Sequence, residues 1–435
     1  MIPTPRTLWI LAITLLLGLI TPWRVNLIWY WGALTSLVSI VIAFDLIAAM
    51  LRRHHLRVVR RCKDTLSLGV WTQVELRIEN HSDSAEKIDL VDHFPETFAG
   101  ESEPLRLQIK AHGHHRMTYR IKPAARGRHD FGHVQVHRYS PWSLWTRNLF
   151  LGEALEVRVF PNFSAVTKYA LRGVDSMQSV VGGHIRQRRG EGLDFHQLRE
   201  YRVGDTFRQI DWKATARSQK LISKEFQEER DQHVIFLIDN GHRMLARDGE
   251  LSHFDHVLNT VLLLGYVALR QGDAVGYMTC EPDPRWMKPR KGRSTINVLS
   301  RKLYDLQPLP QAIDYLRAAT ELSKRQKRRA LIILVTNIRD EDTEEIHVAL
   351  DLLRQRHLVV VASLVEDIIA RTVDKPVSTF ADALDYTSTH NYLADRKSIH
   401  QALHKRGVFV HDTDCTALPG VLTDQYYAIK RAGML

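Results

Sequence analysis

The sequence predicts three parts: an N-terminal transmembrane helical hairpin, an all-β immunoglobulin-like sandwich and an α/β domain with a parallel sheet. Three observations support this fold class. Two long apolar runs open the chain, short alternating segments follow, and compact apolar segments then alternate with helical patterns. The expected boundaries are 1–56 for the hairpin and its basic flank, 57–162 for the sandwich, 163–232 for a linker with a charged motif, and 233–435 for the α/β domain.

The two apolar runs are long enough for a membrane hairpin. Residues 7–21 carry no charge and residues 25–50 carry only Asp45, and a bilayer core needs about 20 apolar residues per helix. Pro-Trp-Arg at 22–24 is the expected turn between two spans. A cleaved signal peptide is the alternative for the first run. It is disfavoured because no small-x-small cleavage site is present and a second apolar run follows directly.

Five arginines in residues 51–61 indicate the orientation. The positive-inside rule places that end of the second span in the cytoplasm. We therefore expect a two-span protein of the bacterial inner membrane, with the N-terminus and the remaining domains cytoplasmic. The chain has 60 Lys and Arg against 49 Asp and Glu, a net charge of +11. Anionic head groups are natural partners for this excess, at on the order of 1 kcal/mol for each basic residue near the surface.

The motifs of common enzymes and cofactor sites are missing from the sequence. No GxxxxGK[ST] loop, GxSxG elbow or HExxH pair is present. The chain has three cysteines, which are scattered and form no CxxC pair. This pattern disfavours a disulfide framework or a zinc ribbon and fits a reducing compartment. We therefore expect no catalytic residues and no cofactor. The three cysteines are Cys62, Cys280 and Cys415.

The middle of the chain has the alternation and turn residues of an antiparallel sandwich. Its histidines suggest a metal site, but His133 and His137 would lie about 13 Å apart on one strand, too far to share an ion. The predicted strands are 71–80, 86–94, 104–111, 115–123, 133–140 and 154–161.

The last 200 residues alternate strands with helices, which predicts a parallel sheet covered on both faces. Ligands of such folds bind at the carboxyl ends of the strands. The predicted strands are 233–240, 271–280, 330–337, 357–366 and 407–414, and the predicted helices are 253–271, 295–307, 312–326, 342–356 and 398–406.

The first of these strands ends in "LIDNGHRM" and resembles the von Willebrand factor A fold. The resemblance implies a metal site with Asp-x-Ser-x-Ser, a Thr from a later loop and an Asp after a further strand. Here Asp239 matches the first Asp, Gly241 and Arg243 replace the serines, Thr295 matches the Thr, and Asn337 replaces the second Asp. Only Asp239 and Thr295 remain as ligands, so no metal is expected and Mg²⁺ is the alternative.

Arg243 has two expected uses at this degenerate site. It can pair with the carboxylate of Asp239, or it can recruit a carboxylate of a partner protein through a bidentate ion pair. The resemblance implies that partners dock on this edge of the sheet. The expected partner-binding face therefore includes Asp340 with the five residues above.

Residues 190–221 alternate acids and bases so closely that three interpretations compete. A nuclease site needs converging carboxylates, but each acid here has a basic neighbour. A nucleic-acid surface needs a net basic charge with stacking aromatics, but the acids nearly cancel the bases. We favour an ion-paired clasp that docks the linker on the α/β domain, with a short helix from Thr206. The expected clasp residues are Arg199, Glu200, Asp205, Arg208, Asp211, Trp212, Lys213 and Arg217.

This charged motif also resembles the signature of the domain of unknown function 58 family. The shared features are Leu-Arg-Glu-Tyr at 198–201, Gly-Asp at 204–205, Arg-x-Ile-Asp-Trp-Lys at 208–213, and Glu-Arg at 229–230 before a strand ending in Asp. The resemblance covers nearly the whole chain. It implies a membrane hairpin, a β-sandwich and a von Willebrand A-like domain, associated with MoxR-type AAA+ ATPases.

Two classes of function follow from the sequence. In the first, the protein is a non-enzymatic, membrane-anchored adaptor that binds a MoxR-type AAA+ ATPase or its client protein in the assembly or maturation of other proteins. In the second, it is a metal-dependent hydrolase or nuclease with an unrecognised site. We expect the membrane and a protein as partners and no nucleic acid.

Overall fold

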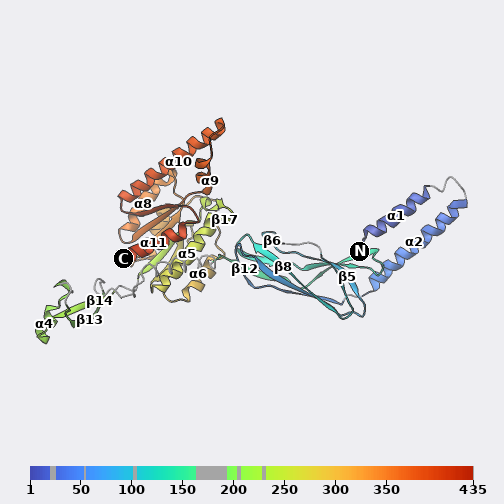
Figure 1. The fold of residues 1–435 in the computed structure, drawn as a ribbon, viewed down its shortest axis with the longest axis horizontal. Coiled ribbons are helices and arrows are strands. Elements are labelled where there is room, and N and C mark those ends of the chain that lie inside the picture. Colours follow the sequence, from blue (N-terminus) through green and yellow to red (C-terminus); the bar gives the residue numbers. More distant parts are fainter. Residues whose placement is uncertain are drawn as a thin grey trace. The chain divides into compact units, whose positions relative to one another are not determined.

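The structure is a computed structural model that describes residues 1–19, 26–52, 55–100, 105–162, 194–202, 207–227 and 232–434. The chain divides into two compact units, Met1–Phe160 and Pro161–Leu435. Each unit is described by itself (Figure 1). The expected turn at 22–24 and most of the expected linker, 163–193, lie outside the described residues.

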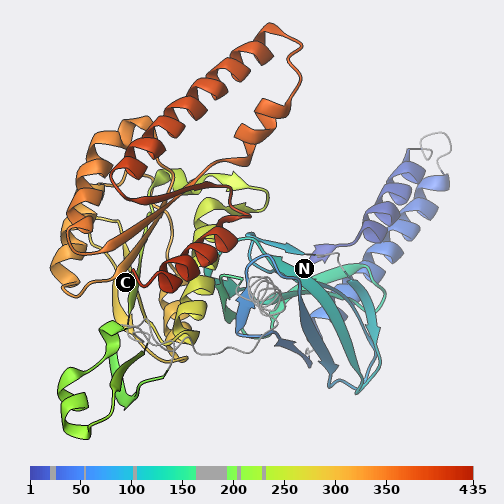
Figure 2. The same cartoon turned by 60° about the vertical axis from the view of Figure 1, so that its left-hand side comes forward.

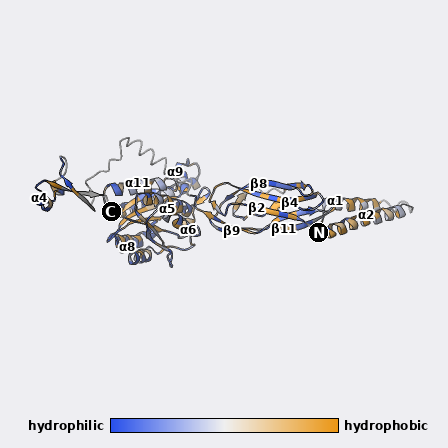
Figure 3. Ribbon diagram, turned by 90° about the horizontal axis from the view of Figure 1, so that it is seen from below, coloured by the Kyte–Doolittle hydropathy of each residue, from blue (hydrophilic) through white to orange (hydrophobic). Residues whose placement is uncertain are grey.

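The first unit begins with two apolar helices, α1 (Pro5–Gly18) and α2 (Asn26–Leu51). Residues Ile28–Leu51 form one helix that is long and apolar enough to cross a membrane, and the ribbon of α2 in Figure 3 is coloured mostly as hydrophobic. The 14 residues of α1 span only about 21 Å, less than a hydrocarbon core of about 30 Å. The structure thus confirms one apolar helix of membrane-spanning length, and the membrane hairpin with its second span remains a prediction.

Both helices are fixed to the β-strands of the same unit by a loop at 140–145. Asp45 of α2 is 1% exposed, and its carboxylate accepts hydrogen bonds from Ser140 Oγ at 2.5 Å and Trp142 N at 3.1 Å. Trp145 Nε1 donates to the carbonyl oxygen of Ile42. The one acid of the second apolar run therefore lies in a polar junction with the β-strands, which removes the cost of placing it in lipid.

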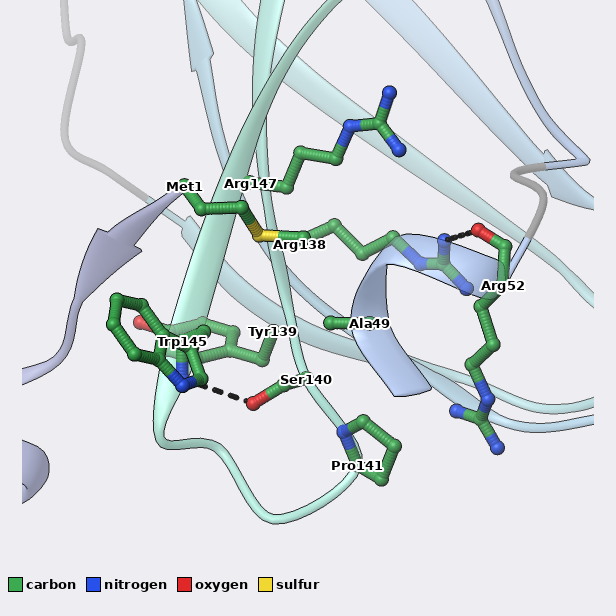
Figure 4. Close-up of a pocket in the computed structure, with 9 residues that line it drawn as sticks. All are labelled: Met1, Ala49, Arg52, Arg138, Tyr139, Ser140, Pro141, Trp145 and Arg147. Atoms are coloured by element: carbon green, nitrogen blue, oxygen red, sulfur yellow. Dashed lines mark hydrogen bonds between the residues drawn. The ribbon is translucent and has the colours of Figure 1, made fainter. Parts of the chain in front are cut away.

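A small pocket marks this junction at the end of α2 (Figure 4). It has room for about one water molecule, about 10 Å³. Arg138 Nη1 donates across it to the carbonyl oxygen of Arg52, at 3.1 Å. The other two nitrogens of this guanidinium pair with Glu86. The pocket is thus a packing feature of the helix–strand junction.

The β-strands of the first unit form three sheets, of order β1-β11-β10-β5-β7, β2-β4-β8-β6 and β3-β12-β9. Alternate residues of β4 and β5 are buried, so each of these strands has one face toward the core. The strands are β1 (Ile2–Pro3), β2 (Leu56–Arg61), β3 (Thr65–Ser67), β4 (Thr72–Asn80), β5 (Glu86–Asp92), β6 (Phe98–Gly100), β7 (Leu105–Ile109), β8 (His114–Pro123), β9 (Gly127–Phe131), β10 (Val134–Tyr139), β11 (Trp145–Leu151) and β12 (Leu155–Phe160).

The six predicted strands of this region correspond to β4, β5, β7, β8, β10 and β12. The strand β2 begins within the expected basic flank, because Leu56 and Val58 alternate with arginines and are buried. The β-rich character of the unit is therefore confirmed. Its immunoglobulin-like subtype remains a prediction.

The second unit contains a sheet of order β19-β18-β15-β20-β21-β22, parallel except for the edge strand β19. Every residue of β18 and β20 is buried, as expected for a sheet covered on both faces. The strands are β15 (His233–Ile238), β18 (Ala274–Thr279), β19 (Trp286–Arg290), β20 (Leu331–Thr336), β21 (Leu358–Leu364) and β22 (Phe409–Thr413).

Helices cover both faces of this sheet (Figures 1 and 2). Residues of α5, α6 and α11 form the core on one face, and residues of α7, α8 and α10 form it on the other. The predicted parallel α/β sheet is confirmed, whereas the von Willebrand A assignment remains a prediction. The helices are α5 (His253–Arg270), α6 (Thr295–Leu303), α7 (Tyr315–Arg325), α8 (Thr343–Arg354), α9 (Asp367–Asp374), α10 (Phe380–Lys405) and α11 (Leu418–Arg431).

The helix α10 is much longer than the predicted helix at 398–406. Most of its first half is exposed, so no apolar stripe marks that half in the sequence. A capping box between Thr379 and Asp382 starts the helix instead.

Candidate functional site

The order of strands in the second unit identifies the edge where a ligand would bind. The first strand of the sheet, β15, has β18 on one side and β20 on the other. The chain therefore reverses its direction of winding between β15 and β20, which in open α/β sheets places the binding crevice at the carboxyl ends of these strands. Asp239 follows β15 and Asn337 follows β20. The structure thus brings these two predicted residues to one edge.

Asp239 is buried and already satisfied by the chain. Its Oδ2 accepts hydrogen bonds from Thr336 Oγ1 at 2.6 Å and from the Tyr315 hydroxyl at 3.0 Å. Its Oδ1 accepts one from the backbone N–H of Gly241 at 2.8 Å. Burial raises the pKa of Asp239, and the donors Thr336, Gly241 and Tyr315 offset part of that rise. Hydrogen-bond donors thus occupy the positions in which a divalent ion would need access.

The segment after β15 is also tightly covered. A Cβ on Gly241 would lie 2.7 Å from Ile313 Cγ1, so the serine that the resemblance implies at this position would require a shift of its neighbours. The loop that covers this segment lies just before α7. It is joined to the segment by a hydrogen bond from His242 N to the carbonyl oxygen of Gln311. Thr295 is not brought to Asp239 by a hydrogen bond. Its hydroxyl donates to the carbonyl oxygen of Lys291, at 2.8 Å.

Arg243 does not pair with Asp239, which corrects one expectation from the sequence. Arg243 lies in a 3₁₀ turn, η3 (His242–Leu245), and its side chain reaches a second turn after β20, η4 (Asp340–Asp342). There Nη2 donates to Glu341 at 2.9 Å and Nη1 donates to Asp342. Nη1 also donates to the carbonyl oxygen of Asn337. The guanidinium is therefore engaged within the chain and is not free to receive a partner's carboxylate.

Asn337 is held by an arginine that sequence reasoning missed. Arg396 of α10 is 1% exposed, and its Nη1 donates to Asn337 Oδ1 at 3.0 Å. Asn337 Nδ2 in turn donates to Glu366 Oε1 at 2.7 Å. Burial opposes the ionised form of Glu366, but its own backbone N–H, Asn337 and Arg339 lower its pKa. An amide bonded at both ends in this way has a structural role, and the guanidinium cation beside its oxygen opposes the binding of a divalent ion there.

The guanidinium of Arg396 joins the ends of three strands. It donates to residues that follow or end β20, β21 and β22, so all of its N–H groups face acceptors. The acceptors are Asn337 Oδ1, the carbonyl oxygen of Ile338, Ser363 Oγ, the carbonyl oxygen of Leu364, the Tyr392 hydroxyl and Asp412 Oδ1.

These contacts do not fit a bound Mg²⁺. The resemblance implies two carboxylates and three hydroxyls, and the edge offers one buried carboxylate that is surrounded by donors. Among the described residues, one group of three or more His, Cys, Asp and Glu side chains could share an ion. It consists of Asp248, His253 and Cys415 and does not include Asp239.

The outer rim of the edge is acidic and exposed. Asp340 is exposed in η4, and the side chain of Glu341 is 71% exposed although it pairs with Arg243. Of the six residues predicted for the partner-binding face, Asp239 and Asn337 are therefore internal. Asp340 is the one that offers a charge to solvent.

The predicted clasp residues lie on a hairpin of β13 (Asp194–Glu200) and β14 (Ile222–Gln227), with η2 (Phe207–Gln209) and α4 (Trp212–Ser218) between the strands. Asp211 caps α4, accepting hydrogen bonds from Lys213 N and Ala214 N at 3.0 Å. These backbone donors, Ala214 first, lower the pKa of Asp211. Asp205 and the side chain of Arg208 lie outside the described residues.

The remaining clasp residues are more exposed than predicted. The ion pair of Glu200 with Lys220 is exposed on both sides, Arg217 and Lys213 are exposed, and Trp212 is 66% exposed. Arg199 donates to the carbonyl oxygen of its neighbour Glu200. Trp212, one of the expected clasp residues, is therefore not covered in this structure. Its position at the start of a cap-stabilised helix directs it outward.

The charged motif and the sheet together match a known protein family. Residues 197–373 match the family described as "Protein of unknown function DUF58". The uncharacterized protein YeaD of Bacillus subtilis (strain 168) is 24% identical over 160 residues, which are 37% of this chain and 38% of that protein. The match therefore spans well under half the length of this relative. Both results support assignment of this segment to the family.

Two solved structures resemble parts of the chain at low scores. Salmonella alpha-2-macroglobulin reacted with methylamine is 11% identical over 24% of this chain and 7% of that chain, with a TM-score of 0.20. The CARDB domain of a Pyrococcus furiosus protein is 11% identical over 24% of this chain and 93% of that chain, with a TM-score of 0.19. These scores are too low to assign a fold.

Proposed function

We propose, from the match of residues 197–373 to the DUF58 family, that this chain is a non-enzymatic membrane-anchored adaptor. Its α/β domain binds a protein partner at the carboxyl edge of the sheet. The partner is a MoxR-type AAA+ ATPase or a client of that ATPase, as the family resemblance implies. The apolar helix near the N-terminus provides the anchor, and the arginines that follow it favour a cytoplasmic location for the domains.

The observation that carries the proposal is the internal satisfaction of the edge. Asp239 receives three donors from the chain, and Asn337 is bonded at both ends of its amide. A reaction centre needs polar groups that face the substrate, and the side chains of Asp239 and Asn337 are bonded within the protein instead. The metal-dependent hydrolase or nuclease therefore gains no support from this edge.

The binding surface on this edge is the exposed acidic turn η4. Arg243 holds the turn in place from beneath through Glu341 and Asp342, so Asp340 and Glu341 project from a fixed position. Charges at the rim of an interface act mainly on orientation and association rate. We infer that the partner presents Lys or Arg here. This replaces the hypothesis from the sequence, in which Arg243 received an acidic partner.

The test is a binding measurement with the detergent-solubilised full chain and the purified MoxR-type ATPase of the same organism, without nucleotide. Asp340→Lys with Glu341→Lys should weaken binding by about tenfold or more. The matched control is Asp424→Lys, an exposed acid on α11, which should bind as the native chain does. Melting curves establish that both variants are folded, and Asp340→Lys alone serves if the double variant unfolds.

Three outcomes would contradict the proposal. The native chain could fail to bind the ATPase, or the rim variant and the control could bind equally well. Binding could also require added Mg²⁺, which would mean that Asp239 forms a metal site after all.

A further inference from the structure

Three side chains that can bind metal converge in the α/β unit, away from Asp239. Asp248 lies in a short hairpin, β16 (Arg247–Asp248) and β17 (Leu251–Ser252), that leads directly into α5. His253 is the first residue of α5, and Cys415 follows β22. One ligand atom from each lies within 4.8 Å of the others. His253 is 0% exposed and Cys415 2% exposed, so the group is a buried cluster.

The distances within the cluster are those of ligand atoms around one ion. His253 Nε2 lies 3.0 Å from Asp248 Oδ2, and the thiol of Cys415 hydrogen bonds to the carboxylate of Asp248. In a tetrahedral zinc site, bonds of about 2.0–2.1 Å to nitrogen and oxygen place these atoms about 3.3 Å apart. Small movements would therefore suffice to coordinate an ion.

Two buried imidazole nitrogens beside the cluster have no partner. Among the described residues, neither His253 Nδ1 nor His256 Nε2 has a hydrogen bond, although both atoms are buried. His256 follows His253 by one turn of α5, and its ring hydrogen bonds to the backbone of Asp248. A histidine that bonds the backbone through one nitrogen and leaves the other free is the usual arrangement of a metal ligand. This arrangement applies to His256; in His253 the nitrogen that faces Asp248 is Nε2, so Nδ1 is not the atom that an ion between them would bind.

We propose that Asp248, His253 and Cys415 hold a zinc-type divalent cation; His256, which contacts the backbone of Asp248 but lies outside this group, is the candidate for a fourth ligand. Sulfur, nitrogen and oxygen ligands together suit a borderline-soft ion such as Zn²⁺ and not Mg²⁺. Loss of the thiol proton leaves one thiolate and one carboxylate, whose two negative charges balance the ion. A neutral complex is the form that a buried site tolerates.

The site has a structural role in this proposal. It ties the hairpin after β15 to the start of α5 and to the segment after β22. Asp248 also accepts a hydrogen bond from Asp367 N at the start of α9, at 3.2 Å. The ion would therefore link the segments that follow β15 and β22, and through Asp248 the segment that follows β21. Removing it should loosen these segments without any change at Asp239.

The experiment uses the full chain in detergent, with metal content measured by mass spectrometry and Co²⁺ as a spectroscopic probe. About one Zn²⁺ or Co²⁺ per chain is expected, with the visible bands of tetrahedral cobalt and a thiolate-to-cobalt charge-transfer band. Cys415→Ser should abolish the charge-transfer band. The matched control is Cys280→Ser, another buried thiol, which should retain it.

A second pair of variants covers failure of Cys415→Ser to fold. His256→Gln should keep the charge-transfer band and weaken Co²⁺ binding by about 10–100-fold, and His253→Gln should prevent binding at this site. Chelation should lower the melting temperature of the native chain and of the Cys280 variant. The proposal is overturned if reconstituted protein binds no ion, or if Cys415→Ser or His253→Gln keeps the native cobalt spectrum.

Discussion

Replacing Arg396 by alanine should be the most damaging single change at the carboxyl edge of the sheet. Arg396 is 1% exposed. Alanine at this position would remove the hydrogen bonds that its guanidinium donates to four acceptors. They are Asn337 Oδ1, the carbonyl oxygen of Ile338, Ser363 Oγ and the carbonyl oxygen of Leu364. A buried acceptor without a partner costs about 1–3 kcal/mol. Ser363 Oγ keeps a hydrogen bond from Ile338 N, so for the other three acceptors the lower end of that range already gives a loss of roughly 3 kcal/mol.

Hydrogen exchange of the full chain measures this loss locally. A change of about 3 kcal/mol corresponds to a decrease of roughly 150-fold in the protection of amides that exchange by unfolding of the sheet. The amides of β20 and β21 are the relevant probes, because both strands end at Arg396. Arg396→Lys keeps the charge but has fewer donors, so its protection should lie between those of the native chain and of Arg396→Ala.

The control is Arg406→Ala, just after the end of the same helix. Arg406 pairs with Asp351, and both side chains are nearly half exposed, so the loss should be about 0–1 kcal/mol. If Arg396→Ala changed the protection of β20 and β21 no more than this control does, the claim that Arg396 joins the strand ends would be refuted.

Three further predictions concern pH, the membrane junction and topology. Burial, with Arg356 nearby, lowers the pKa of His357 from 6.5 to about 4. Between these pH values the unfolded state binds more protons than the folded state. The free energy of unfolding should therefore decrease as the pH falls from about 6.5 to about 4. Denaturant unfolding of His357→Gln should depend less on pH across that window than the native chain does; an unchanged slope would show that His357 is not responsible. Asp45→Leu leaves the donors of Ser140 and Trp142 unpaired, which should cost about 1–3 kcal/mol and make proteolysis of the first unit faster. The control is Asp83→Leu, at a fully exposed carboxylate. Equal proteolysis of the two variants would contradict the claim that Asp45 holds the junction together. A reporter fused after Leu435 should be active only in a cytoplasmic format, and activity of a periplasmic reporter would reverse the proposed orientation.

Periodicity predicted six strands of the first unit and the five parallel strands of the second, but not β9, β11 or α9. The runs that became β4, β5, β8 and β10 alternate with period two, and those that became β15, β20 and β21 are continuous apolar runs between helical patterns. The first half of α10 and the strand β19 were missed. An exposed helix needs no apolar stripe, and an edge strand that contains Pro289 has little of the composition of a buried one.

Side-chain partners at the candidate site were the weakest part of the sequence argument. Asp239 and Asn337 were found because they directly follow strands whose carboxyl ends must share an edge. The pairing of Arg243 was not found, because its partners Glu341 and Asp342 lie almost 100 residues away in sequence. The resemblance to the von Willebrand A fold also assigned Thr295 to the site of Asp239, whereas Tyr315 and Thr336 are the residues whose hydroxyls reach Asp239.

The sequence by itself determined the long apolar helix, the β-rich unit and the parallel α/β sheet, because these follow from patterns that repeat within a few residues of one another. Only the tertiary structure decided what each buried polar group bonds to. Arg396 meets the ends of three strands, and Asp248 and Cys415 come together from opposite ends of the α/β domain. Burial obliges polar groups to find partners, but the positions of the strands and helices decide which partners lie within reach.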